Sequence, residues 1–290
     1  MGTRVGWLWS ATGWAVRPNN AREVLTTLSA IGGHSSGQRF AWRGQPSSSY
    51  DLVSSLHRSL APNTGEGEVR AHEREMIERA RSWGLGVGST TFVDDFRLLA
   101  DLQHYGIKTR LIDFSHNPLT ALWFACQDPA PEAQEKSGIV LALNVTRFPS
   151  YTTVRTEKTW ESAGYGPSAN LEHALGTGGP FLLEVAHPND RLRAQEGLFV
   201  SSATPSRVGL RHAFNPFRTI DVSFSKGDTE KLTATLTEDR HPGRPLELPF
   251  VAVVIPARSK KKLLQYLAVS FNRTARTLFP DFEGFRQYGV

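Results

Sequence analysis

The sequence has little cysteine, no long apolar run and no acidic excess, and each absence narrows the possibilities. A single cysteine, Cys126, cannot form a disulfide within the chain, which is typical of a protein from a reducing compartment. No apolar stretch approaches the roughly 20 residues that a membrane-spanning helix needs. The N-terminus lacks a charged start followed by an apolar segment. We therefore expect no secretory signal, no membrane partner and a cytoplasmic location.

The chain does contain enough apolar residues for a sizeable core, together with a basic surplus. It has 290 residues, of which 39% are hydrophobic, and a formal net charge of +5. We expect a single domain over residues 1–290, with an irregular N-terminal arm over residues 1–18 and a basic C-terminal third over residues 201–290. A strand that covers the core is the alternative for the arm. Strand and helix patterns alternate between long insertions, which favours an α+β fold with a mixed sheet core and flanking helices.

A dense cluster of polar side chains lies at residues 103–115, QHYGIKTRLIDFS. Apolar residues at three- and four-residue steps over residues 91–102 predict a helix just before it. Residues 108–113 then predict a short strand, and Asn117 followed by Pro118 predicts the start of another helix. The end of a strand beside the start of a helix is a common place for ligands, because free backbone N–H groups and the helix dipole favour anions.

Several side chains of this segment have a structural alternative to ligand binding. Asp113 could form a buried ion pair with Arg43 or with Arg110. His104 could be a capping cation in the last helical turn, and Thr109 could serve the strand. The ligand-binding candidates in and after the segment are His104, Tyr105, Thr109, Arg110, Asp113 and Asn117.

A second candidate element is the hexapeptide FAWRGQ at residues 40–45. Phe40 and Trp42 alternate as in a half-buried strand, and Arg43 comes at its end. An arginine fixed there could fork onto a phosphate or a carboxylate. Gly44 would let the backbone turn or let another group approach closely. Arg43 and Gln45 are therefore candidate ligand-binding residues.

These segments resemble the FRG domain family, which is named for its Phe-Arg-Gly motif. The resemblance is carried by Trp42-Arg43-Gly44-Gln45, by the QHYG…TRLIDFS…NP…ALWFA block, by RLRAQEGLF at residues 191–199 and by LFPDFEG at residues 278–284. Trp42 stands where the family has phenylalanine, a conservative departure. The matches run from about residue 40 to residue 284, and the middle block is the most specific of them.

The order of these elements is similar to that of ADP-ribosyltransferases, so the resemblance implies an ADP-ribosyltransferase-like fold with NAD as its substrate. It implies that Arg43 holds the pyrophosphate or ribose of NAD and that Ser115 orders the pocket. Glu196 would then be the catalytic acid. A turn or capping role is the alternative for Ser115.

The chemistry of this reaction requires a carboxylate and no metal. Breaking the nicotinamide–ribose bond builds positive charge on the sugar, which a nearby carboxylate stabilises, as in glycoside cleavage. Asp281 and Glu283 are rivals of Glu196 for this role. Gln195, which belongs to the family pattern beside Glu196, is a further NAD-binding candidate.

The densest basic cluster begins a predicted helix near the C-terminus. Its residues Arg258, Lys260, Lys261 and Lys262 are candidates for contacts with nucleic-acid phosphates. A solvated helix face is the alternative.

Two function classes follow from the sequence. The first is an NAD-dependent ADP-ribosyltransferase that modifies nucleic acid, either DNA or RNA. Because FRG proteins are widespread in bacteria and phage, such an enzyme would act as a toxin or a phage-defence effector. The alternative is a non-catalytic sensor module that binds a nucleotide or another anion in the same pocket. A hydrolase is a weaker third possibility, since no metal-ligand spacing is present.

Overall fold

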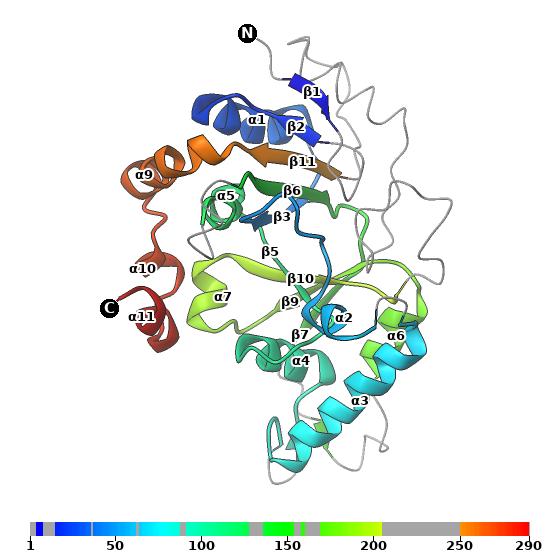
Figure 1. Ribbon diagram of the computed structural model, residues 1–290. Helices are drawn as coiled ribbons and strands as arrows, with labels where there is room; N and C mark the ends of the chain where they lie inside the picture. The colour runs from blue at the N-terminus through cyan, green and yellow to red at the C-terminus, as the bar shows by residue number, and fades with distance from the viewer. Residues whose placement is uncertain are drawn as a thin grey trace.

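The computed structural model describes residues 4–7, 15–35, 37–61, 64–87, 91–127, 136–153, 158–159, 169–204 and 250–289 (Figure 1). Part of the predicted basic third, residues 205–249, therefore lies outside the described residues. The described residues form one large sheet with helices packed along it.

The sheet has nine strands in the order β1-β2-β11-β6-β3-β5-β10-β9-β7. In chain order they are β1 (Arg4–Trp7), β2 (Ala15–Arg17), β3 (Phe40–Gln45), β5 (Ile112–Ser115), β6 (Gly138–Asn144), β7 (Ser150–Thr153), β9 (Phe181–Val185), β10 (Gly197–Ser201) and β11 (Phe250–Ile255). Two short strands, β4 (Thr91–Phe92) and β8 (Lys158–Thr159), pair separately. β2 and β11 are parallel, as are β7 and β9, whereas the other neighbours are antiparallel. The mixed sheet with helices confirms the predicted α+β class.

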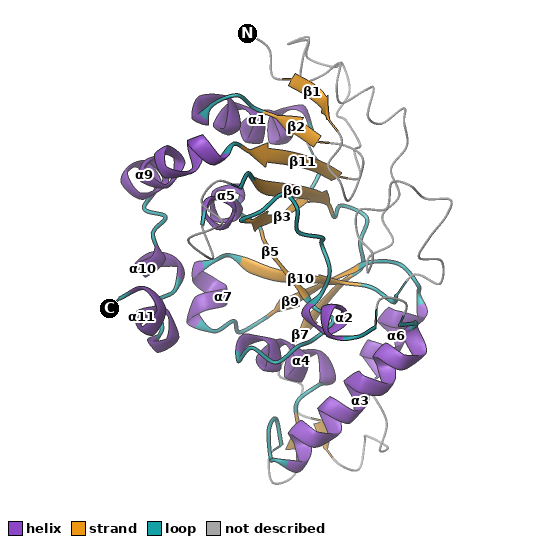
Figure 2. Ribbon diagram, viewed as in Figure 1, coloured by secondary structure: helices purple, strands orange, loops and turns teal. Residues whose placement is uncertain are grey.

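The helices gather in two groups along the sheet (Figure 2). In one group, α1 (Ala21–His34), α5 (Pro118–Cys126) and α9 (Lys260–Phe271) pack near β11, β6 and β3. In the other, α4 (Asp95–His104) packs near β9, and α3 (Glu66–Ser82) and α6 (Ala169–Gly176) pack against α4. The shorter helices are α2 (Ser55–Ser59), α7 (Asp190–Ala194), η2 (Ala257–Ser259), α10 (Ala275–Leu278) and α11 (Phe282–Tyr288). None of the helices in the described ranges has the length and apolar character needed to cross a membrane.

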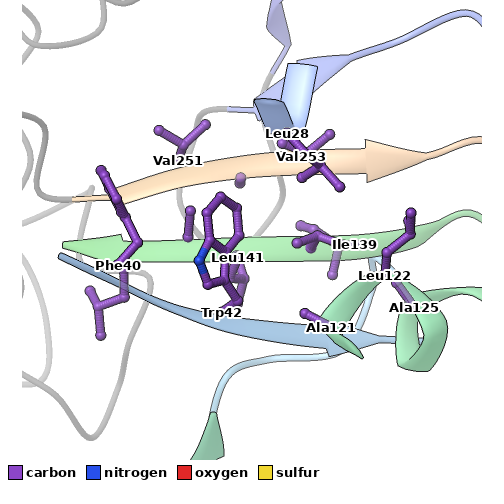
Figure 3. Packing of buried hydrophobic residues seen from close by; sticks show 14 of the residues in the cluster. Leu28, Phe40, Trp42, Ala121, Leu122, Ala125, Ile139, Leu141, Val251 and Val253 are labelled. Carbon is purple, nitrogen blue, oxygen red and sulfur yellow. The ribbon is translucent and has the colours of Figure 1, made fainter. Parts of the chain in front are cut away.

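The larger hydrophobic cluster lies around β3, β6 and β11 (Figure 3). All of β11 is buried, and so is β6 up to its last residue. Side chains from α1, such as Leu28, and from α5, such as Leu122, pack against these strands. Burial of this apolar surface is the main favourable contribution to the stability of the fold.

Two glycines let α5 lie close to the sheet. A Cβ atom at Gly44 would lie 1.8 Å from the carbonyl oxygen of Ala121, and one at Gly138 would lie 2.1 Å from that of Ala125. No side chain fits at either position, so only glycine permits the approach. Gly44 of the aromatic–Arg–Gly motif is thus explained by the packing of α5 against β3.

The predicted helix start at Asn117-Pro118 is confirmed, whereas two predicted boundaries are displaced. The Asn117 side chain accepts a hydrogen bond from the Leu119 N–H at 2.8 Å and caps α5. The helix predicted over residues 91–102 is α4, which begins later because Asp94 caps it and residues 91–92 form β4. The strand predicted over residues 108–113 is β5, which begins four residues later and ends two residues later. Before it, the Thr109 backbone bonds to residues 55 and 56 instead of to a strand.

The N-terminal arm, predicted to be irregular over residues 1–18, contains two strands in its described part. β1 pairs with β2, and β2 pairs with β11 of the main sheet. Ala15 and Val16 are fully buried. The described part of the arm therefore matches the alternative of a strand that covers the core.

Candidate functional site

Predicted site residues surround a cavity of about 420 Å³ between the ends of β3, β5, α4 and α7. Its polar lining residues include Arg43, Gln103, His104, Asp113, Ser115, Arg191 and Gln195, and its aromatic ones include Trp42, Phe124 and Phe279. Within the described ranges, no group of three or more histidine, cysteine, aspartate or glutamate side chains could hold a metal ion. The cavity lining is therefore partly polar and partly aromatic.

Arg43 lies in the cavity wall and is held by a single hydrogen bond to the described residues. Nη1 donates to the backbone carbonyl of Asp113 at 2.6 Å, and the side chain is 21% exposed. Nε is buried and has no hydrogen-bond partner among the described residues. Burial lowers the pKa of the guanidinium, an effect that the charge of Asp113 opposes and that of Arg58 reinforces. A guanidinium with so few bonds can bind a phosphate or carboxylate of a ligand.

Asp113 is the one carboxylate among the described residues that line this cavity. Its side chain is 61% exposed, and Oδ2 accepts a hydrogen bond from Nε2 of Gln103 at 3.0 Å. Gln103 is oriented by Thr109, whose hydroxyl donates to its Oε1. Thr109 is fully buried and does not line the cavity, so it positions Gln103 instead of binding a ligand. The alternative that it serves the strand is also wrong, because β5 begins at Ile112.

Ser115 and Gln195 hold the end of β5 against the turn before β10. The Ser115 hydroxyl donates to the Gln195 carbonyl at 2.7 Å and accepts from the Asn117 N–H at 2.9 Å. The Gln195 side-chain amide donates to the carbonyl of Leu278 at 3.1 Å. Both residues line the cavity, and these bonds to the backbone fix its shape.

Glu196 does not line the cavity, contrary to the expectation for a catalytic acid. It adopts a left-handed conformation, with φ 50°, in the turn between α7 and β10. Oε1 accepts hydrogen bonds from Nη2 of Arg273 at 2.6 Å and from Nδ2 of Asn117 at 2.9 Å. Asn117 also lies outside the cavity lining, because its side chain caps α5 and bonds to Glu196. The two residues connect three segments of the fold.

Arg110 is a structural residue and not a ligand-binding one. Its side chain is fully buried. Nε donates to the two carboxylate oxygens of Glu73 at 2.8 and 2.9 Å, and Nη1 donates to Glu66 at 3.0 Å. A buried guanidinium needs such partners to offset its loss of hydration. The suggested pair of Arg110 with Asp113 is therefore wrong, since both partners come from α3.

Of the remaining candidates, His104 lines the cavity, whereas Tyr105 and Gln45 do not. Burial lowers the pKa of His104, and the charge of Arg191 lowers it further. Tyr105 is 81% exposed at the end of α4. Gln45 is buried, donates through Nε2 to the Asp51 carbonyl at 3.3 Å and lines a neighbouring cavity.

Arg191 is a cavity residue that the residue-by-residue predictions missed. It donates through Nε and Nη2 to the carboxylate of Asp281, both at 2.8 Å, and lies 5.1 Å from the centre of the Phe279 ring. These hydrogen bonds lower the pKa of Asp281. Glu283, the other rival acid, pairs with Arg286 on the surface of α11. The sequence did contain a signal for Arg191, because it is the first residue of the segment at residues 191–199 that resembles the FRG family.

The predicted basic cluster is only partly exposed. Lys260 is 3% exposed, and its Nζ donates to two backbone carbonyls at 2.7 and 3.4 Å, the second of them from Gln127 at the end of α5. Its prediction as a nucleic-acid contact is wrong, because its charge caps backbone carbonyls in the interior. The exposed members of the cluster are Arg258, Lys261 and Lys262.

Residues 38–134 match the family model of the FRG domain. No curated protein and no solved structure matches the chain. The matched residues supply β3, α4, β5 and α5, and with them Arg43 and Asp113. The segments at residues 191–199 and 278–284, which complete the cavity, lie beyond the match. The resemblance to the FRG domain family is therefore confirmed over residues 38–134.

Proposed function

We propose that this protein is an NAD-dependent ADP-ribosyltransferase whose site is the cavity that contains Arg43 and Asp113. The observation that carries the proposal is their proximity: an arginine held by one hydrogen bond lies 3.9 Å from an exposed carboxylate. The guanidinium is suited to a pyrophosphate, and the carboxylate to a positively charged sugar. The order of elements in the FRG family is similar to that in ADP-ribosyltransferases. This similarity supports NAD as the substrate and an ADP-ribosyltransferase-like fold.

In the proposed reaction, the bond between the nicotinamide nitrogen and C1′ of the ribose breaks. Its electron pair leaves with neutral nicotinamide, and positive charge builds on the ribose. Asp113 stabilises this charge, while Arg43 positions the pyrophosphate. The nucleophilic atom of the acceptor then forms a bond to C1′ and loses its proton to water. Phe124 and Phe279 offer aromatic surface for the nicotinamide ring.

Asp113 takes the catalytic role that the family resemblance assigned to Glu196. A carboxylate stabilises an oxocarbenium-like sugar only from nearby, because the interaction weakens with distance and with exposure to water. Glu196 lies outside the cavity lining and is paired with Arg273. Asp281 is likewise paired, with Arg191. Among the described residues, the carboxylate of Asp113 accepts a hydrogen bond from the uncharged Gln103 and lies 3.9 Å from its nearest cation, Arg43, so it is the better candidate.

We propose nucleic acid, DNA or RNA, as the acceptor. Arg258, Lys261 and Lys262 are exposed near the start of α9, and the chain has a net charge of +5. Such basic surfaces attract phosphates irrespective of base sequence. From the distribution of the FRG family we further propose a cytoplasmic toxin or phage-defence effector.

One observation favours the alternative of a non-catalytic sensor. The acid expected from the family resemblance, Glu196, is engaged outside the cavity. A module that only binds a nucleotide or another anion would need Arg43 but no catalytic carboxylate.

The experiment that tests the proposal is nicotinamide release from NAD by the purified protein, alone and with DNA, RNA or cell lysate. Release that rises with one nucleic acid, with label from the ADP-ribose part carried onto it, would establish the transferase and identify its acceptor class. Binding of NAD without release under any of these conditions would favour the sensor. If the protein neither releases nicotinamide nor binds NAD, both the transferase and the sensor are rejected.

A further inference from the structure

A second cavity, of about 690 Å³, adjoins the first one. It lies between the end of β3, residues 49–53 and α2, and Arg43 and Gly44 line both cavities. The first cavity, at about 420 Å³, is small within the range of roughly 300–1,000 Å³ that small-molecule sites occupy. A dinucleotide consists of two nucleosides joined by a pyrophosphate, so two cavities that meet at an arginine match its shape.

We propose that the second cavity binds the adenosine 5′-phosphate half of NAD, with Arg58 at its phosphate and Tyr50 against its adenine. This inference rests on the proposed function, because it takes NAD to be the ligand of the first cavity. It adds two binding residues, Arg58 and Tyr50, that lie outside every motif of the sequence.

Arg58 supplies a second cation to the region that Arg43 occupies. It is exposed on α2, lines the second cavity and donates through Nη1 to the carbonyl of Val53 at 2.5 Å. Arg43 and Arg58 both line the second cavity, and the charge of Arg58 lowers the pKa of Arg43. A pyrophosphate between them would replace the repulsion between like charges with two charge-assisted contacts.

Tyr50 supplies aromatic surface in the same cavity. It is 43% exposed and belongs to the cavity lining. An aromatic residue exposed in a cavity can stack against a purine base. Asp51, the next residue, also lines the cavity and can accept hydrogen bonds from ribose hydroxyl groups.

The orientation of the dinucleotide follows from the chemistry of the first cavity. Asp113 lines the first cavity and not the second. The ribose that becomes positively charged is the one attached to nicotinamide, and it must lie near that carboxylate. The nicotinamide half therefore occupies the first cavity, and the adenosine half occupies the second.

Binding of AMP, nicotinamide mononucleotide and NAD to the full chain, measured by calorimetry, tests the two cavities separately. Arg58→Gln is expected to weaken AMP and NAD binding by about tenfold or more, because a charge-assisted phosphate contact is lost. Nicotinamide mononucleotide binding should change much less. Tyr50→Ala should weaken AMP binding, whereas Tyr50→Phe should retain it. Arg79→Gln is the matched control, since it removes an arginine from an exposed pair on α3 that lines neither cavity.

The outcomes distinguish this inference from the proposed function. AMP binding that is unchanged in both Arg58→Gln and Tyr50→Ala would overturn the inference. Binding of NAD and nicotinamide mononucleotide without binding of AMP would also overturn it, and would leave the proposed function standing. AMP binding that depends on Arg58, without binding of either nicotinamide mononucleotide or NAD, would show that the second cavity binds a nucleotide but would reject NAD as the substrate, and with it this assignment. If none of AMP, nicotinamide mononucleotide and NAD binds, both this inference and the proposed function are overturned.

Discussion

Arg43 and Asp113 are joined through the backbone of Asp113 and not through its carboxylate. Nη1 of Arg43 donates to the Asp113 carbonyl at 2.6 Å, whereas Oδ2 lies 3.9 Å away and accepts from Gln103. A tight ion pair would neutralise both groups and leave neither for a ligand. Here the arginine is positioned by a neutral acceptor, so its charge remains directed at the cavity. Both groups can therefore act on a bound molecule.

Arg43→Gln should abolish NAD binding and change stability little. The substitution removes the charge but, within the described residues, only one hydrogen bond, which corresponds to about 1 kcal/mol of unfolding free energy. Arg43→Lys, which keeps the charge but loses the fork geometry, should bind with intermediate affinity. Calorimetry with NAD and thermal melting test this together. A large loss of melting temperature with unchanged affinity would instead support a purely structural role for Arg43.

Asp113→Asn should bind NAD but release nicotinamide at least about 100-fold more slowly than the wild type, because the charge that stabilises the sugar is lost. Glu196→Gln should release nicotinamide near the wild-type rate, since Glu196 lies outside the cavity lining. Both changes replace a carboxylate with an amide of nearly the same shape. Single-turnover kinetics measure the effect. The reverse pattern would restore the catalytic role to Glu196.

Gly44→Ala should destabilise the fold by about 3 kcal/mol or more, because the new Cβ would overlap the carbonyl oxygen of Ala121. Gly106→Ala is the matched control. Gly106 has φ +80° and no atom within 4 Å of a new Cβ, so its change should cost only the backbone strain of about 1–2 kcal/mol. Urea unfolding of the two variants gives the comparison, and equal losses would contradict the packing argument.

Arg110→Met should cost about 3–5 kcal/mol of unfolding free energy, because it leaves the buried carboxylate of Glu73 without its partner. Arg79→Gln, in an exposed pair, should cost at most about 1 kcal/mol. The double variant Arg110→Met/Glu73→Leu should recover much of the loss. Chemical denaturation measures all three. A loss under 1 kcal/mol for the single variant would argue against this buried network.

Stability should fall as the pH is lowered from about 7 to 5, in part because of His57. Burial, together with the charge of Arg110, lowers the pKa of His57 to about 4, and the charge of Glu66 partly opposes this shift. The unfolded chain binds a proton near pH 6.5 and the folded one does not, so unfolding is favoured by up to about 1.4 kcal/mol for each pH unit in this window.

His57→Gln should make the melting temperature less dependent on pH between 7 and 5. His72→Gln, on the exposed side of α3, is the control for the loss of a histidine side chain. Equal pH dependence in wild type and His57→Gln would assign the effect to other groups.

The sequence by itself determined the elements that depend on local chemistry. Asn117 and Pro118 predicted the start of α5 because capping and the fixed φ of proline act within one helical turn. The alternation around Trp42 predicted β3, and the motifs of residues 40–45 and 103–125 predicted the FRG family. Arg43 and Asp113 were found in this way, and both line the cavity.

Only the tertiary structure decided which of the polar residues face that cavity. Arg43 and Arg110 were both predicted to bind a ligand, but Glu73, 37 residues from Arg110, makes Arg110 a buried structural residue. Glu196 is engaged by Arg273, and Arg58 reaches the second cavity from a short helix without a motif. Periodicity and capping report the conformation of a residue and the face it occupies. The partner that meets its side chain comes from a distant segment, and only the folded chain brings the two together.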